Sequence, residues 1–168
     1  MAKEEERKPV KYFDQIAGWA KHPGSRSLYY LFLPVFFFGF LGTIWMIPFP
    51  EIDFLKENGY HIYLNWASFL IAILIYCYLK IVPMLSYMVL LSIGAMSYLI
   101  VQLEYYEQNG GIAAWMIFLL LFLISLLILW VGTRAEENKP SLQQFLMFLF
   151  VGPLWVWHLV FKYFKIKH

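Results

Sequence analysis

Four histidines and one acidic connector supply the candidate ligands for a metal ion that we consider in this sequence. The histidines are His22, His61, His158 and His168. The connector reads VGTRAEENKP (131–140) and contributes the carboxylates of Glu136 and Glu137. A non-haem iron site commonly uses two imidazoles and one carboxylate on one face, with positions left open for dioxygen. Whether these side chains can meet depends on the elements that carry them.

The composition of the chain indicates a membrane protein. Hydrophobic residues make up 61% of the 168 residues and charged residues 14%, whereas a soluble domain has roughly 45–50% and about 25%. A soluble chain of this length has too large a surface for its volume to bury so much apolar area. The net charge of +2 gives no reason to expect a nucleic-acid partner. The single cysteine, Cys77, excludes an intrachain disulfide.

Five apolar runs are each long enough, at about 20 residues, to cross the hydrocarbon core as a helix. They cover residues 29–49, 62–79, 81–101, 112–131 and 144–161. The last run contains Gly152-Pro153, so it is expected to be either kinked or re-entrant there, and we favour the kink. The sequence therefore predicts an all-α integral membrane protein, a bundle of about five transmembrane segments. The connector's Pro140 should stop one helix, and Ser141 with Gln144 reads as a capping box for the next.

The segment before the first run has a different character. Residues 10–20 (VKYFDQIAGWA) alternate aromatic and apolar side chains with charged ones, which is typical of a short helix lying in the membrane interface. We therefore divide the chain into an N-terminal segment, residues 1–28, and a polytopic helical domain, residues 29–168. The first segment has no apolar core of the kind found in a secretory signal.

The distribution of lysine and arginine predicts which connectors are cytoplasmic. Six of the 13 basic residues precede residue 29, and none lies in the connector after the third run. With a cytoplasmic N-terminus and five crossings, nine basic residues lie inside and four outside. A re-entrant last segment changes this division to twelve and one. In both topologies the N-terminal segment and the 131–140 connector share the cytoplasmic side.

This topology limits which histidines can reach the acidic connector. His22 lies on the same side as the connector, whereas His61 opens the second run about 30 Å away, across the hydrocarbon. A straight helix places His158 about 22 Å from the start of the last segment. Only a hairpin at Gly152-Pro153 would bring His158 back toward the connector. No Asp, Glu, Lys or Arg lies in the middle of a span, which argues against a pump or an ion-coupled transporter.

Two blocks of the sequence resemble the membrane family of 2-hydroxy fatty acid dioxygenases that act in fatty acid α-oxidation. The blocks read HPGSRSLYYLFLP (22–34) and VGTRAEENKPSLQQFLMFLFVGP (131–153). The residues of the second block that fall at or within one position of the family's spacing are Gly132, Glu137, Pro140, Leu142 and Pro153. Between the blocks the resemblance is one of hydropathy only.

The resemblance implies Fe(2+) chemistry on long-chain 2-hydroxy acyl substrates, in the endoplasmic reticulum or a bacterial inner membrane. It makes His22 and Glu137 metal ligands, with His158 joining them only if the last segment is re-entrant. Two positions depart from the family, because Thr133 stands where it uses one histidine, and Tyr29 or Tyr30 stands where it uses another. The alternative interpretation of His22 is that it is a turn histidine, hydrogen-bonded at the level of the lipid headgroups.

Three hypotheses follow for the function of the chain. The protein is a divergent iron-dependent dioxygenase, a catalytically silent relative that binds lipid, or a structural subunit that packs against partner membrane proteins or a second copy. Iron content of the purified protein distinguishes the first hypothesis from the others. A co-purifying acyl lipid distinguishes the second from the third.

Overall fold

The computed structural model describes residues 7–50 and 64–165, and every regular element in these ranges is an α-helix. The helices are α2 (Arg7–Trp19), α3 (Pro23–Trp45), α5 (Trp66–Ile81), α6 (Pro83–Gln108), α7 (Ala114–Arg134) and α8 (Leu142–Tyr163). The prediction of an all-α membrane bundle is confirmed. Four of these helices, α3, α6, α7 and α8, are long and apolar enough to cross a membrane.

Helix α5 differs from the other apolar helices in length. It has 16 residues, fewer than the roughly 20 that cross the hydrocarbon core. The predicted second run, 62–79, begins at residues that lie outside the described ranges, and the described helix starts only at Trp66. Asn65 precedes it and accepts a hydrogen bond from the backbone N–H of Ser68 at 3.0 Å. Asn65 therefore caps its own helix.

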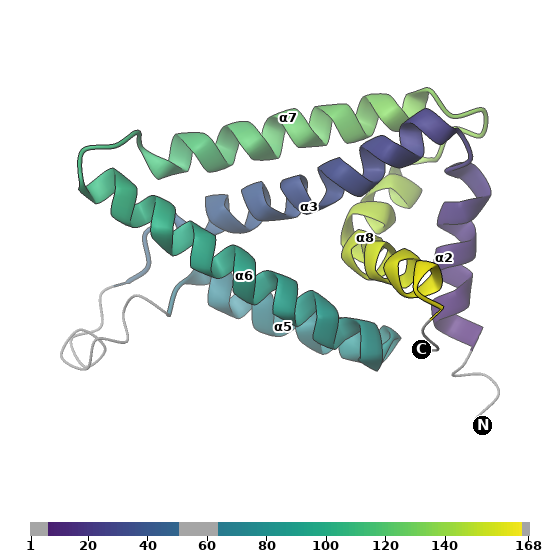
Figure 1. Cartoon of the computed structure of the whole chain (residues 1–168), viewed down its shortest axis with the longest axis horizontal. Coiled ribbons are helices and arrows are strands. Elements are labelled where there is room, and N and C mark those ends of the chain that lie inside the picture. Colours follow the sequence, from purple (N-terminus) through teal and green to yellow (C-terminus); the bar gives the residue numbers. More distant parts are fainter. Residues whose placement is uncertain (1–6, 51–63, 166–168) are drawn as a thin grey trace.

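Helices α3 and α7 form an antiparallel pair along the long axis of the molecule (Figure 1). Glycine allows this close approach. A Cβ atom at Gly39 would lie 2.5 Å from the backbone N of Phe122, and one at Gly42 would overlap the Phe118 ring. The two helices therefore touch through their backbones, as small residues permit in membranes. Gly39 and Gly42 are thus packing positions between α3 and α7.

Helices α5 and α6 form a tight antiparallel hairpin beside this pair (Figure 1). One extended residue, Val82, separates them, and Pro83 is the first residue of α6. Proline is tolerated there because the first helical N–H has no intrahelical partner. The Tyr78 hydroxyl near the end of α5 donates a 2.7 Å hydrogen bond to the carbonyl of Phe150 in α8. This bond ties the hairpin to the last helix.

Helix α8 runs without interruption through Gly152 and Pro153. The re-entrant hairpin that we considered at this position is therefore not formed. Ser141 and Gln144 make the predicted capping box at the start of α8, with reciprocal hydrogen bonds of 2.8 and 3.3 Å. Figure 1 shows α8 crossing α3 and α7 at a steep angle, so its second half leaves the α3–α7 pair.

The short N-terminal helix is α2, which stands beside α8 at one end of the molecule (Figure 1). Its buried side chains are Phe13, Ile16 and Trp19. Phe13 stacks on His158 of α8 with ring centroids 4.6 Å apart, and Trp19 contacts the Phe148 ring edge-on at 5.1 Å. The aromatic face that we expected to meet headgroups therefore packs on the protein.

Candidate functional site

A buried carboxylate joins the α2–α3 junction to the loop after α7. Glu136 is only 3% exposed. Its Oε2 accepts hydrogen bonds from the backbone N–H groups of Lys21 at 3.1 Å and His22 at 3.0 Å. Its Oε1 accepts a third, at 3.2 Å, from the hydroxyl of Tyr29. Three donors thus converge on one acidic side chain.

This arrangement gives Glu136 a structural role. A buried carboxylate is costly unless it is hydrogen-bonded, and backbone N–H groups just before a helix need an acceptor because the helix offers none. Glu136 meets both requirements, and it fixes the entry of the chain into α3. Sequence analysis selected its neighbour, Glu137, because the family spacing falls there. Glu136 and Glu137 are adjacent in an irregular loop, and the sequence does not indicate which of the two carboxylates is buried.

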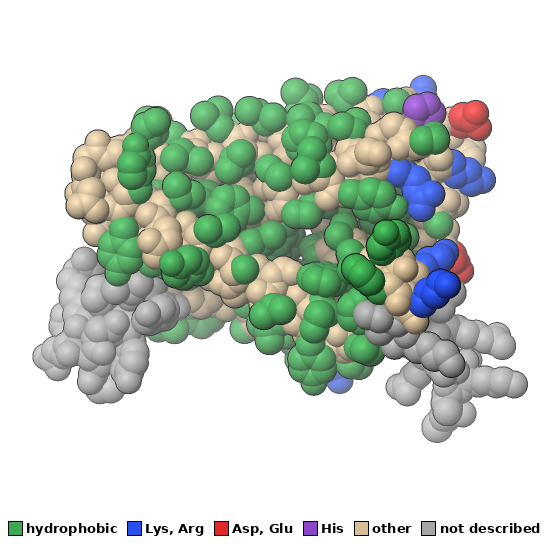
Figure 2. Space-filling view, viewed as in Figure 1, with side chains coloured by type: hydrophobic (Ala, Val, Ile, Leu, Met, Phe, Trp, Pro, Cys, Tyr) green, Lys and Arg blue, Asp and Glu red, His purple; other side chains and the backbone are tan. Residues whose placement is uncertain are grey.

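His22 and Glu137 are both exposed and line one cavity at this end of the molecule. The cavity has a volume of about 210 Å³, and its walls also include Trp19, Lys21 and Asn138. Figure 2 shows Lys, Arg, Asp, Glu and His side chains gathered at this end, while hydrophobic side chains cover most of the rest of the visible face. The two residues predicted as metal ligands are therefore neighbours. Their role as ligands stays a prediction.

The positions that carry histidines in the resembled family lie close together across the α3–α7 pair. Tyr29 is fully buried, and a Cβ at Gly132 would lie 3.1 Å from its ring. Ser25 donates to the Gly132 carbonyl at 3.4 Å. The next residue, Thr133, is 1% exposed and donates to the carbonyl of Trp130 at 2.7 Å. Both substituted positions therefore hold side chains that hydrogen-bond within the protein.

His158 is not brought to the acidic connector. It lies half-buried on the continuous helix α8, where its ring stacks on Phe13 of α2. Within residues 7–50 and 64–165, no three His, Cys, Asp or Glu side chains are grouped so that they could hold a metal ion. His22 is the one imidazole among the described residues that line the cavity, and the carboxylate of Glu136 is engaged by three donors. The described residues therefore do not fit a site with two imidazoles and a carboxylate.

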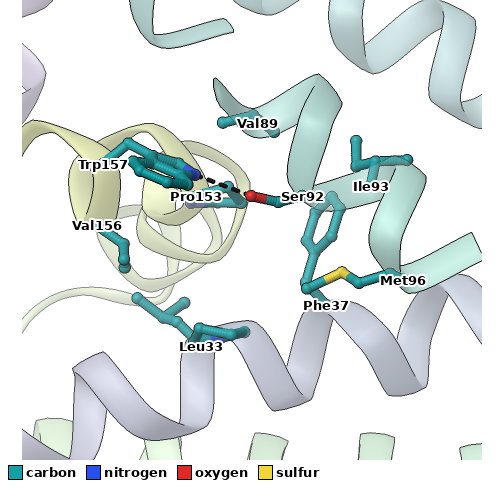
Figure 3. A pocket seen from close by; sticks show the side chains of 10 residues that line it. Leu33, Phe37, Val89, Ser92, Ile93, Met96, Pro153, Val156 and Trp157 are labelled. Carbon is teal, nitrogen blue, oxygen red and sulfur yellow. Dashed lines mark hydrogen bonds between the residues drawn. The ribbon is translucent and has the colours of Figure 1, made fainter. Parts of the chain in front are cut away.

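A second hollow lies between α3, α6 and α8, and sequence analysis gave no sign of it (Figure 3). It is a narrow crevice of about 60 Å³, part of which is open to the outside. Its walls are Leu33, Pro34, Phe37, Val89, Ser92, Ile93, Met96, Pro153, Val156 and Trp157. Helix periodicity alone could not place these residues together, because the crevice depends on the crossing of α8 over α3 and α6.

The crevice has one polar pair in an otherwise apolar wall. The indole N–H of Trp157 donates to the Ser92 hydroxyl at 3.0 Å, drawn as the dashed line in Figure 3. The same hydroxyl donates to the carbonyl of Met88 one turn earlier, at 2.9 Å. Both polar groups are thus satisfied within the protein, and the crevice presents an apolar surface to an occupant.

Comparison of this chain with family models, with curated proteins and with solved structures finds no match. The resemblance to the 2-hydroxy fatty acid dioxygenases therefore rests on the two blocks of sequence described above, and it stays a prediction. What the structure itself establishes is a helical membrane protein with a polar cavity at one end and an apolar crevice between three of its helices.

Proposed function

We propose that this integral membrane protein binds the acyl chain of a membrane lipid in the crevice between α3, α6 and α8. The observation that carries the proposal is the composition of the crevice wall. Nine of its ten lining residues are apolar, and the tenth, Ser92, is already hydrogen-bonded. A hydrocarbon chain is the apolar ligand that a bilayer supplies in the largest amount.

The size of the crevice limits how much of such an occupant it holds. Pockets for small molecules span about 300–1,000 Å³ and are lined mainly by apolar and aromatic side chains. At about 60 Å³ the crevice lies well below this range, so it admits a short stretch of a chain and not a whole lipid. Each methylene group transferred from water to such a wall contributes about 0.8 kcal/mol. From bilayer hydrocarbon the gain is smaller, so binding depends on the fit of the chain to the crevice.

The hydrogen bonds at the polar end support lipid binding without iron chemistry. Tyr29 and Thr133 occupy the family's histidine positions and bond within the protein, and Glu136 caps the α2–α3 junction. These contacts favour a catalytically silent relative over a dioxygenase. We derive no reaction step, because the described donors do not fit the ligand set that such a step requires.

Photolabelling tests the proposed binding site. Purified protein in detergent is irradiated with a phospholipid that carries a diazirine in its acyl chain, and labelled peptides are identified by mass spectrometry. We expect labels on crevice residues of α6 and α8, and we expect Met96→Trp to reduce them several-fold by filling the crevice. Leu99→Trp is the matched control, because Leu99 lies on the same helix with 52% of its surface exposed.

Two outcomes of this experiment would contradict the proposal. Equal labelling of both variants, with each eluting as a monodisperse peak, would show that the chain does not occupy the crevice. Labels spread evenly over the exposed faces of α5 and α6 would also contradict the proposal.

Metal analysis tests the remaining enzymatic alternative, which draws on the shared cavity of His22 and Glu137. We expect protein incubated anaerobically with ferrous iron and then desalted to retain less than one-tenth of an equivalent. Stoichiometric iron in the wild type that is lost in both His22→Ala and Glu137→Ala would instead establish a metal site. It would overturn the proposal that the protein is catalytically silent.

A further inference from the structure

We propose that the polar cavity beside Glu137 binds the zwitterionic headgroup of a primary-amine phospholipid such as phosphatidylethanolamine. This inference rests on the proposed function in that the same lipid places its chain in the crevice. The phosphate lies toward Trp19, Lys21 and His22, and the ammonium lies toward Glu137 and Asn138.

An unpaired donor points to a ligand with hydrogen-bond acceptors. Trp19 is 5% exposed and forms part of the cavity wall. Its indole Nε1 is buried and has no hydrogen-bond partner among the described residues. A buried donor left unpaired is unfavourable, and a rotation of the ring toward the cavity would let a phosphate oxygen accept from it.

The same side of the cavity carries positive charge. Lys21 and His22 line it, and α3 begins directly after them at Pro23. The N-terminus of a helix carries a partial positive charge and N–H groups without intrahelical partners. An anion at this position therefore gains from the indole N–H and from the lysine, whereas the backbone N–H groups of Lys21 and His22 are already bonded to Glu136.

Two further residues of the cavity wall carry acceptors. Glu137 is exposed, and among the described residues neither it nor Asn138 has a hydrogen-bonded partner, whereas Glu136 accepts from three donors. A phosphate alone would face an unneutralised carboxylate there. An ammonium group has three N–H donors and would satisfy Glu137 and the amide oxygen of Asn138. A trimethylammonium group has none, which is the basis for discrimination against choline.

The spacing of the two hollows matches one leaflet of a bilayer. The cavity lies at Pro23 and the crevice begins at Leu33. Ten residues of helix separate them by about 15 Å. Half of a hydrocarbon core about 30 Å thick has the same length. A lipid whose headgroup lies at the cavity therefore extends its chain to the depth of the crevice.

Native mass spectrometry of delipidated protein in detergent tests the headgroup assignment. The protein is titrated with ethanolamine, choline and glycerol phospholipids that carry identical chains. We expect at least tenfold tighter binding of the ethanolamine lipid than of the other two. We expect Glu137→Gln to reduce this preference to within about twofold, and Trp19→Phe to weaken all three lipids. Asp14→Asn is the control, because it makes the same change at an exposed position of α2 outside the cavity.

Equal affinity of the wild type for the three lipids would overturn the proposal, as would a preference that Glu137→Gln leaves intact. Competition by soluble glycerophosphoethanolamine at the lipid's own concentration would assign the cavity to a free solute instead. Met96→Trp separates the two proposals. If it leaves ethanolamine selectivity and affinity unchanged, the headgroup site stands and the chain site in the crevice is wrong.

Discussion

The two faces of α3 are built in opposite ways. Toward α7 the helix presents Gly39 and Gly42, and the two backbones touch. Toward α6 and α8 it presents Leu33, Pro34 and Phe37, and a crevice remains open. Both faces are apolar, so hydrophobicity does not distinguish them. The difference lies in shape, because lipid offers helices no hydrophobic reason to associate and close packing must come from small residues.

The two faces of α3 therefore have different roles in the bundle. The α3–α7 seam, which we define as the contacts from Ser25 to Gly42 on α3 and from Phe118 to Glu136 on α7 and its following loop, holds the protein together. It ends in the hydrogen bonds of Glu136. The crevice face contains a proline from α3 and another from α8, Pro34 and Pro153. Each proline lacks a backbone N–H, and its ring hinders regular packing of the preceding turn.

The largest effect is expected from adding a single methyl group to the seam. In Gly39→Ala the new Cβ would meet backbone atoms of Phe122 and Leu121, which cannot rotate away as a side chain can. Overpacking typically costs 1–3 kcal/mol, and we expect about 3 kcal/mol here, with low yield of monodisperse protein. Thermal unfolding in detergent, followed by size-exclusion fluorescence, measures this loss.

Gly94→Ala is the matched control for this prediction. Gly94 lies in the interior of α6, and nothing lies within 4 Å of a Cβ built there. The same chemical change should leave the melting temperature unchanged or raise it slightly, because alanine favours a helix over glycine. If both variants melt alike, backbone contact between α3 and α7 does not stabilise the bundle.

The next largest effect is expected at the polar end of the seam. Glu136→Ala removes the acceptor of the His22 N–H and of the Tyr29 hydroxyl, whereas the Lys21 N–H keeps its 2.9 Å bond to the carbonyl of Trp19. Unpaired buried groups cost about 1–3 kcal/mol each, and because water can reach the nearby cavity we expect about 2 kcal/mol in total. Trypsin should then cut after Lys21 faster than in the wild type, and the unfolding temperature should fall.

Glu137→Ala provides the comparison, since this neighbouring carboxylate is exposed and surface substitutions usually change stability by less than about 0.5 kcal/mol. Equal proteolysis of the two variants would mean that the loop does not hold the α2–α3 junction.

Local patterns in the sequence predicted the helices of the seam better than they predicted the polar cavity and the crevice. Hydropathy located the long spans, and the capping box at Ser141 depends only on residues three apart, so both were readable without tertiary structure. Gly39 packs against α7 and Gly94 meets nothing within 4 Å, and residue type alone could not tell them apart, because it does not reveal which side of a helix meets a partner. Burial of Glu136 in place of Glu137 depends on the path of an irregular loop. The crevice depends on a crossing angle that no short-range pattern encodes.

The smallest effect is expected from removing one hydrogen bond between α5 and α8. Tyr78→Phe removes the bond from α5 to the Phe150 carbonyl of α8 and keeps the ring. Such interhelical bonds in membranes contribute about 0.6 kcal/mol on average, so we expect a shift of one or two degrees in melting temperature. Tyr76→Phe, at a side chain that is 63% exposed, should give no shift. A loss as large as that of Gly39→Ala would show that α8 is held as rigidly as α7, and the crevice could then not adapt its width to a chain.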